Sequence, residues 1–318
     1  MARVLITGGT GMIGKRLSQM LAEKGYEVIV LSRQSSVVSR QSLVGSSQSN
    51  VSYAQWNIED GWIDKDAFAK ADYIIHLAGA GIADKKWNRK RKQEIVESRT
   101  KSSGLIVTAL KTIPNKVKAV ISASAIGWYG ADTDSSLQKG FKETDAAADD
   151  FLGNTCKQWE QNIEPVTDLQ KRLIILRTGI VLSNDGGAYE EFKKPIRNGI
   201  AAILGSGEQV ISWIHVEDIC RIYIYTLENN QLQGVYNAVA PMPVKNKDFT
   251  LQLAKAIRGK YFISVHVPSF ILKLMLGEMS IEVLKSTTVS AEKIRQAGFT
   301  FLYPSIQAAL QLLTNEKN

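Results

Sequence analysis

The stretch VLITGGTGMIG, from Val4 to Gly14, decides the fold of this chain. Its aliphatic start predicts a strand, and the glycines that follow predict a tight turn into a helix. Glycines at positions 8, 9, 11 and 14 fit both the Gly-x-Gly-x-x-Gly and the Gly-x-x-Gly-x-x-Gly spacing. Between a strand and a helix, this spacing is typical of a loop that binds the phosphates of a dinucleotide.

Each glycine of this loop has a physical task. Gly8 or Gly9 permits the tight turn, and Gly11 lets the backbone approach a pyrophosphate. Gly14 allows the helix to pack closely on the strand, while the helix N-terminus presents unpaired N–H groups to the anion. The loop therefore predicts dinucleotide binding at the start of the chain.

Strand-like and helix-like segments alternate downstream of the loop. The alternation predicts βαβ units and a parallel sheet covered on both faces, the Rossmann-type doubly wound α/β class. We expect residues 1–185 to form this dinucleotide-binding domain and 186–318 to form a smaller C-terminal substrate lobe. Within the lobe, about 211–240 is expected to return to the main sheet, and the Ser-rich stretch 34–50 to form a connection after the second strand.

The composition predicts an ordinary globular protein. The chain has 318 residues, of which 44% are hydrophobic, and its apolar stretches, such as 262–279, are interrupted well short of the roughly 20 residues of a membrane span. The first strand begins too early for a signal peptide, so we expect a cytoplasmic protein with no membrane partner. Cys156, Cys220 and three scattered histidines lack ligand spacing, so we expect buried cysteines and no metal.

Positive charge is concentrated in KKWNRKRK, from Lys85 to Lys92, within a chain of net charge +8. The run is either a solvated helix face or an anion site for a phosphate-bearing small-molecule substrate. Acidic residues follow at once and no basic-aromatic pattern repeats, so we do not expect nucleic acid as a partner. We expect a monomer or a homodimer.

The end of the second strand selects the cofactor. In NAD sites an acid at this point accepts a hydrogen bond from the ribose 2′-hydroxyl, but EVIVLSRQ ends with Ser32 and Arg33 and has no acid nearby. An arginine can pair with a 2′-phosphate, so NADP(H) is predicted in preference to NAD(H). The alternative is that Arg33 is an exposed surface cation.

Four motifs carry a family resemblance: TGGTGMIG, DYIIHLAG (72–79), AVISASAIGWYG (119–130) and RTGIVL (177–182). Their order resembles that of extended short-chain dehydrogenase/reductases, the class that includes nucleotide-sugar epimerases and dehydratases. WNRKRKQEIVESR, FLGNTCKQWE, SWIHVEDI and the C-terminal segment are similar to an atypical branch, the epimerase family proteins, over nearly the whole chain.

The resemblance implies a set of cofactor contacts. The first loop would wrap the pyrophosphate, Asn57 would touch the adenine, the segment after DYIIH would line the ribose, and Ser122 would lie near the nicotinamide. Together with Ser32 and Arg33 at the end of the second strand, these contacts give the full set of predicted cofactor-binding residues: Thr7, Gly8, Gly9, Thr10, Gly11, Met12, Ile13, Gly14, Ser32, Arg33, Asn57, Leu77, Ala78, Gly79, Ser98 and Ser122.

The resemblance fails at the catalytic Tyr-x-x-x-Lys, in which the tyrosine exchanges a proton with the substrate and the lysine lowers its pKa. Aligning FLGNTCKQWE through Glu160 puts Leu152 at the tyrosine position and Cys156 at the lysine position, and neither can do this chemistry. Lys157 is about 100° further around the helix and would have to bend back. The Tyr-x-x-x-Lys from Tyr189 to Lys193 lies in the wrong element.

Ser124 and Tyr129 are the predicted catalytic residues. Ser124 matches the catalytic serine of the superfamily, and Tyr129 is the best remaining proton source. The alternatives are a serine that caps a turn and a buried tyrosine with a satisfied hydroxyl. Two hypotheses follow: an NADP-dependent oxidoreductase or epimerase-like enzyme on a small polar substrate, or a non-catalytic NADP-binding sensor or scaffold. For His215 and Asp218, a structural hydrogen bond between loop and helix is the favoured interpretation.

Overall fold

The central feature of the computed structural model, which describes residues 1–33 and 50–315, is an eight-stranded sheet. The strand order is β12-β7-β6-β5-β1-β2-β3-β4, and every neighbouring pair is parallel except β3 and β4. The strands are β1 (Arg3–Thr7), β2 (Glu27–Ser32), β3 (Val51–Asn57), β4 (Trp62–Ile63), β5 (Tyr73–His76), β6 (Ala119–Ala125), β7 (Arg172–Thr178) and β12 (Gly234–Ala238). The predicted Rossmann-type α/β class is confirmed.

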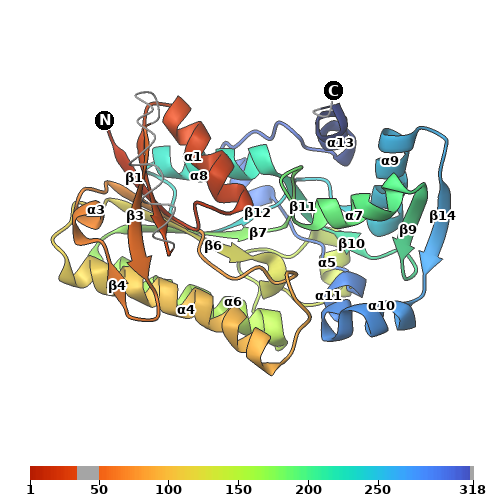
Figure 1. The fold of residues 1–318 in the computed structure, drawn as a ribbon, viewed down its shortest axis with the longest axis horizontal. Coiled ribbons are helices and arrows are strands. Elements are labelled where there is room, and N and C mark those ends of the chain that lie inside the picture. The colour runs from red at the N-terminus through yellow and green to blue at the C-terminus, as the bar shows by residue number, and fades with distance from the viewer. Residues whose placement is uncertain (34–49, 316–318) are drawn as a thin grey trace.

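Helices cover both faces of this sheet (Figure 1). On one face lie α3 (Lys65–Ala69), α4 (Arg89–Thr112) and α6 (Phe151–Ile163); on the other lie α1 (Met12–Glu23) and α8 (Val216–Glu228). Strand alternation separates two cores, because successive side chains point to opposite faces. Val4 and Ile6 pack toward α1, whereas Leu5 packs toward α4.

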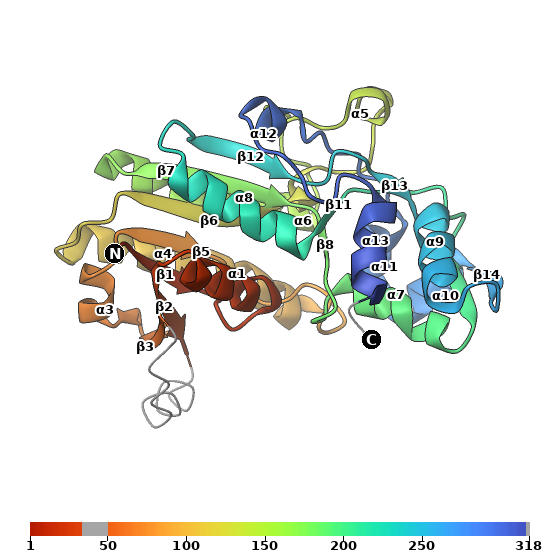
Figure 2. The ribbon, with the colours of Figure 1, turned by 90° about the horizontal axis from the view of Figure 1, so that it is seen from above.

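Most of the C-terminal part lies beyond the carboxyl ends of the parallel strands, whereas residues 292–296 pack beside β12 (Figure 2). A third hydrophobic core lies in this part of the protein and includes Tyr189, Trp213 and Phe249. The helices are α7 (Ala188–Arg197), α9 (Asn246–Arg258), α10 (Ser269–Leu276), α11 (Ser280–Leu284), α12 (Glu292–Gln296) and α13 (Ile306–Asn315). Three short strand pairs complete it: β8 (Ile180–Leu182) with β11 (Trp213–His215), β10 (Val210–Ile211) with β13 (Val244–Lys245), and β9 (Ile200–Leu204) with β14 (Ile263–Val267).

Two elements of the second half of the chain build the Rossmann layer itself. Strand β12 pairs with β7, and α8 packs beside α1 over the sheet. Asp218 fastens the C-terminal segment to α8, since its carboxylate accepts hydrogen bonds from the backbone N–H groups of Leu302 and Tyr303 at 2.9 and 2.8 Å. This is the structural bond between loop and helix that the sequence favours.

The cysteines and the helices can be compared with what the composition predicts. Cys156 and Cys220 are both free and buried, as predicted. No helix within residues 1–33 and 50–315 is both long and apolar enough to cross a membrane.

Candidate functional site

The glycine loop turns directly from β1 into α1. Gly8 has φ +70°, a conformation that favours glycine, and its carbonyl accepts a hydrogen bond from the Gly11 N–H at 3.0 Å. A Cβ at Gly14 would lie 2.4 Å from the Gly8 oxygen and 2.5 Å from the Gly9 Cα, so only glycine allows this approach. Helix and loop therefore touch backbone to backbone.

The first turn of α1 is left open toward a ligand. Its N-cap is Gly11, which has no side chain to accept from the helix amides, and the first turn holds no acidic residue. Thr10 and Gly11 are exposed. A helix N-terminus with free amides and no competing carboxylate suits a phosphate group. The predicted pyrophosphate-binding loop, Thr7 to Gly14, which includes Met12 and Ile13, thus has a geometry that fits a pyrophosphate; we call this loop the cradle.

A buried histidine joins the glycine loop to the loop after β5. The Thr7 hydroxyl lies 2.7 Å from Nδ1 of His76, and Nε2 of the same ring lies 3.1 Å from the Ser103 hydroxyl. Thr7 also accepts from the Ala78 N–H at 3.3 Å, so both loops are held at fixed distance. Burial lowers the pKa of His76 to about 3, which keeps the ring neutral.

This histidine predicts a specific loss of stability in acid. The unfolded chain protonates His76 near pH 6.5 and the folded protein only near pH 3, so the unfolded state binds one more proton between these values. As the pH drops through this window, the free energy of unfolding should fall in both proteins. The fall should be steeper in the native protein than in His76→Gln, by about 1.4 kcal/mol per pH unit. Urea unfolding at pH 7 to 4.5 measures this. The exposed His266→Gln should keep the native slope, and parallel curves for native protein and His76→Gln would refute the assignment.

The remaining predicted cofactor residues lie along the same edge of the sheet. Ser32 and Arg33 are at the end of β2, with Ser32 buried and Arg33 exposed. Asn57, at the end of β3, accepts from the Glu59 N–H at 3.0 Å and so also shapes a turn. Of the stretch 34–50, only Asn50 lies within the described residues.

Leu77, Ala78 and Gly79 directly follow β5. Ser98, on α4, accepts from the Ala80 N–H at 2.9 Å and thereby fixes the loop after Gly79. Ser122 is buried within β6, where its hydroxyl donates to the neighbouring Ala123 carbonyl at 3.1 Å. Its contact to a cofactor stays a prediction.

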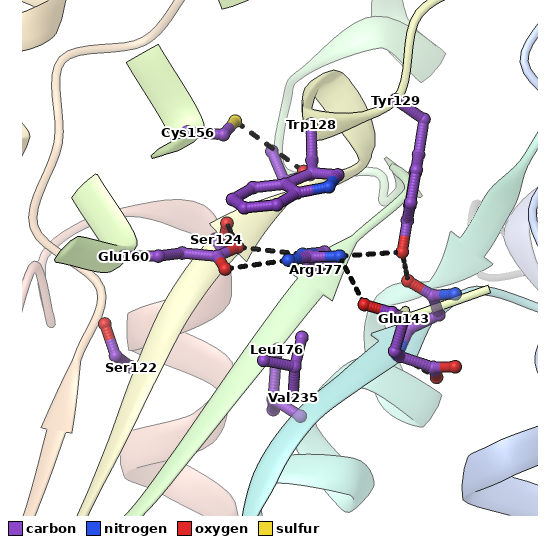
Figure 3. Close-up of polar contacts among 12 residues, drawn as sticks. Ser122, Ser124, Trp128, Tyr129, Glu143, Cys156, Glu160, Leu176, Arg177 and Val235 are labelled. Atoms are coloured by element: carbon purple, nitrogen blue, oxygen red, sulfur yellow. Dashed lines mark hydrogen bonds and ion pairs between the residues drawn. The ribbon is translucent and has the colours of Figure 1, made fainter. Parts of the chain in front are cut away.

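A buried ion pair lies under the predicted catalytic serine (Figure 3). Arg177, from β7, donates two hydrogen bonds of 2.9 Å to the two carboxylate oxygens of Glu160, from α6. The Ser124 hydroxyl donates to the same carboxylate at 2.6 Å, and the Trp128 ring lies over the guanidinium, 3.6 Å from its Cζ. Ser124 is 3% exposed, so this hydroxyl is committed to the pair.

Tyr129 belongs to the same network. Its hydroxyl donates to Oδ1 of Asn237 at 2.7 Å and accepts from Arg177 at 3.1 Å, and its side chain is fully buried. Burial raises the pKa of Tyr129 to about 12, which keeps the phenol neutral. The structure thus gives Ser124 and Tyr129 a structural role, and their catalytic role stays a prediction that would require the network to open.

The positions of the missing tyrosine and lysine are sealed. Leu152 and Cys156 are buried beneath the 3-10 turn η1 (Ile126–Trp128), where a Cβ at Gly127 would lie 3.1 Å from the Leu152 Cβ and 3.7 Å from the Cys156 sulfur. Lys157 is exposed and points to a groove between α6, β7 and β12. That groove, of about 1030 Å³, lies away from the glycine loop.

Glu160, Arg177 and Asn237 are members of the network that were not predicted from the sequence. One signal was available: Arg177 directly follows the apolar run LIIL of β7, and a charge on a buried strand needs a partner. Which residue supplies the partner is set by the packing of α6 on β7, and the sequence does not show it.

The basic run divides between two roles. Arg91 is buried and pairs with Asp84 at 3.3 Å and Glu94 at 2.7 Å, and Lys92 forms an ion pair with Glu278 of the C-terminal part. Four cations of the run are exposed and have no ion-pair partner within the part of the chain that the structure describes: Lys85, Lys86, Arg89 and Lys90.

Comparison with known families matches both parts of the chain. The model of the NAD dependent epimerase/dehydratase family matches residues 4–152, and that of a domain of unknown function, DUF1731, matches residues 267–313. The first match includes the glycine loop and extends to α6. The second covers α10, α11, α12 and most of α13.

Individual relatives match the whole chain. An epimerase family protein of Staphylococcus aureus strain NCTC 8325 is 33% identical over 316 residues, 99% of this chain and 100% of that protein. Human epimerase family protein SDR39U1, isoform 2, whose crystal structure contains NADPH, is 28% identical with a TM-score of 0.82, over 98% of this chain and 99% of that chain. The nucleoside-diphosphate sugar epimerase of Corynebacterium glutamicum, also 28% identical, has a TM-score of 0.75 over 99% of this chain and 58% of that chain. The chain therefore belongs to the NAD dependent epimerase/dehydratase family, in the branch of epimerase family proteins that carry the C-terminal DUF1731 domain.

Proposed function

We propose that this protein is an NADP-dependent, epimerase-like oxidoreductase that acts on a small polar substrate. The observation that carries the proposal is the open cradle of the glycine loop, in which Gly14 lies against Gly8 and Gly11 leaves the helix amides free. The human relative with NADPH supports the same cofactor. When bound, the nicotinamide supplies hydride transfer, and the protein has to orient the substrate and exclude competing reactions.

Arg33 supports NADP in preference to NAD. It is exposed at the end of β2, the strand that neighbours β1, where the adenine ribose lies in folds of this class. The sequence has no acid between Val28 and Gln34 to accept from a 2′-hydroxyl or to repel a 2′-phosphate. The guanidinium can donate to two phosphate oxygens at once.

Calorimetric titration with NADPH and NADH tests the cofactor proposal. We expect tighter binding of NADPH, and a reduction of that preference by about 10-fold in Arg33→Ala, in keeping with the loss of one charge-assisted hydrogen bond. Lys111→Ala removes a positive charge from an exposed position outside the basic run and should leave the preference unchanged. Equal affinities for the two cofactors in the native protein would exclude the assignment.

A non-catalytic NADP-binding protein is the second candidate. The sealed positions of Leu152 and Cys156 favour it, together with the commitment of the Ser124 and Tyr129 hydroxyls to a buried network. Such a protein would sense the NADP redox state or act as a scaffold. The exposed cations of the basic run instead favour a substrate that carries a phosphate.

Oxidation of NADPH, followed by absorbance across a panel of carbonyl compounds and nucleotide sugars, separates the two candidates. Turnover of any member supports the enzyme. Tight NADPH binding without turnover across the panel supports the sensor.

A further inference from the structure

Arg99 is a cation without a carboxylate partner at the edge of the sheet that the dinucleotide would occupy. It lies on α4, the helix between β5 and β6, and its Nη1 donates to the Ile95 carbonyl of its own helix at 2.9 Å. Within residues 1–33 and 50–315, no carboxylate lies within ion-pair distance of it. Buried or half-buried charges in proteins are normally paired. The Arg99 guanidinium has five N–H donors, and only one of them has a hydrogen-bond partner among the described residues.

The surroundings of Arg99 place it beside the missing lysine. A Cβ at Gly79 would lie 3.2 Å from the Arg99 Cζ, so the guanidinium packs directly against the loop after β5. From the neighbouring helix α6, the centroid of the Trp159 ring lies 5.0 Å from the same Cζ. Burial raises the pKa of the Cys156 thiol to about 12, and the positive charge of Arg99 is near enough to oppose that rise. Cys156 is the residue at the lysine position.

The same place contains a second unsatisfied donor. The indole Nε1 of Trp159 is buried and has no hydrogen-bond partner among the described residues. Apart from the Ile95 carbonyl, no acceptor of the described residues meets these two donor groups, and such a site suits a ligand that brings oxygen atoms.

The topology identifies which half of a dinucleotide meets Arg99. A doubly wound sheet binds the two nucleotides on its two halves, and the adenosine lies on the half that begins with the glycine loop. Gly79, Arg99, Cys156 and Trp159 all follow β5 or β6, in the other half. We propose that Arg99 supplies the cation of this site in place of the missing lysine, and that it donates hydrogen bonds to oxygen atoms in the nicotinamide half of the dinucleotide. The inference rests on the proposed function, since it requires a dinucleotide at this edge.

Calorimetry with two ligands tests this role. NADPH carries both halves, whereas adenosine 2′,5′-bisphosphate carries the adenosine and its 2′-phosphate but no nicotinamide half. Arg99→Gln should weaken NADPH about 10- to 100-fold, the range for a charge-assisted hydrogen bond, and change the affinity for the bisphosphate less than 2-fold. Arg99→Lys should recover part of the NADPH affinity. Unchanged bisphosphate binding also shows that the variant is folded.

Lys111→Gln is the control, because it removes a positive charge from an exposed position in the last turn of the same helix, outside the basic run, and should affect neither ligand by more than 2-fold. Equal losses for both ligands in Arg99→Gln would overturn the inference, as would NADPH affinity equal to that of the native protein. Native protein that binds neither ligand would instead overturn the proposed function.

Discussion

Replacing Arg177 with methionine should lower the free energy of unfolding by about 3 to 5 kcal/mol, the largest stability loss that we expect from any single substitution at the site. The change leaves the Glu160 carboxylate buried without its bidentate partner, and removes the donor that holds the Tyr129 hydroxyl at 3.1 Å. An uncompensated buried charge is the main cause of the loss. Urea unfolding of the two proteins at pH 7 measures it.

Two further variants separate charge from packing. In Arg177→Met combined with Glu160→Gln, the buried charge is gone while an amide oxygen still accepts from Ser124, so the double variant should be more stable than Arg177→Met alone. Arg197→Met breaks the exposed pair with Glu190, 2.9 Å long, and should cost less than about 1 kcal/mol. Strict additivity of the two single losses in the double variant would show that the pair is not coupled.

Gly14→Ala should weaken NADPH binding at least 100-fold. The new Cβ would lie 2.4 Å from the Gly8 oxygen, 2.5 Å from the Gly9 Cα and 2.8 Å from the Gly9 carbonyl carbon. All three atoms belong to backbone, which cannot rotate away as a side chain can. The first turn of α1 must therefore shift from the loop, which separates the amides that converge on the pyrophosphate. The same displacement should destabilise the fold by about 1 to 3 kcal/mol.

Gly104→Ala supplies the control for this substitution. Gly104 lies within α4, where an added Cβ meets no atom within 4 Å, and alanine in a helix interior is more favourable than glycine by about 0.5 to 1 kcal/mol. This variant should bind NADPH like the native protein and unfold at a slightly higher urea concentration. Native NADPH affinity in Gly14→Ala would show that the cradle is not the binding site.

The parts of the fold that could be predicted are those encoded locally. The glycine loop, the β-branched strands and the helical periods each lie within a few residues, so the sheet class and the position of the phosphate cradle follow from short patterns. The absence of the tyrosine and the lysine was equally visible, because their spacing is local.

The buried network could not be predicted, because its members are distant in the sequence. The Tyr129 hydroxyl meets Asn237, which is 108 residues away, and Ser124 meets Glu160, 36 residues away. The turn η1 lies between Ser124 and Tyr129, and its packing on α6, which the sequence does not show, accompanies the burial of Tyr129 in the core. Arg99 was missed for the same reason, since its neighbours Gly79 and Trp159 come from two other elements.

The bond from Ser124 to Glu160 changes how retention of this serine over evolution should be interpreted. The Ser124 hydroxyl donates a hydrogen bond to the buried Glu160 carboxylate, so it contributes to the stability of the fold whether or not any substrate reaches it. A lineage that lost its chemistry would still keep this serine, together with Glu160 and Arg177. Persistence of Ser124 among relatives would therefore not by itself indicate turnover.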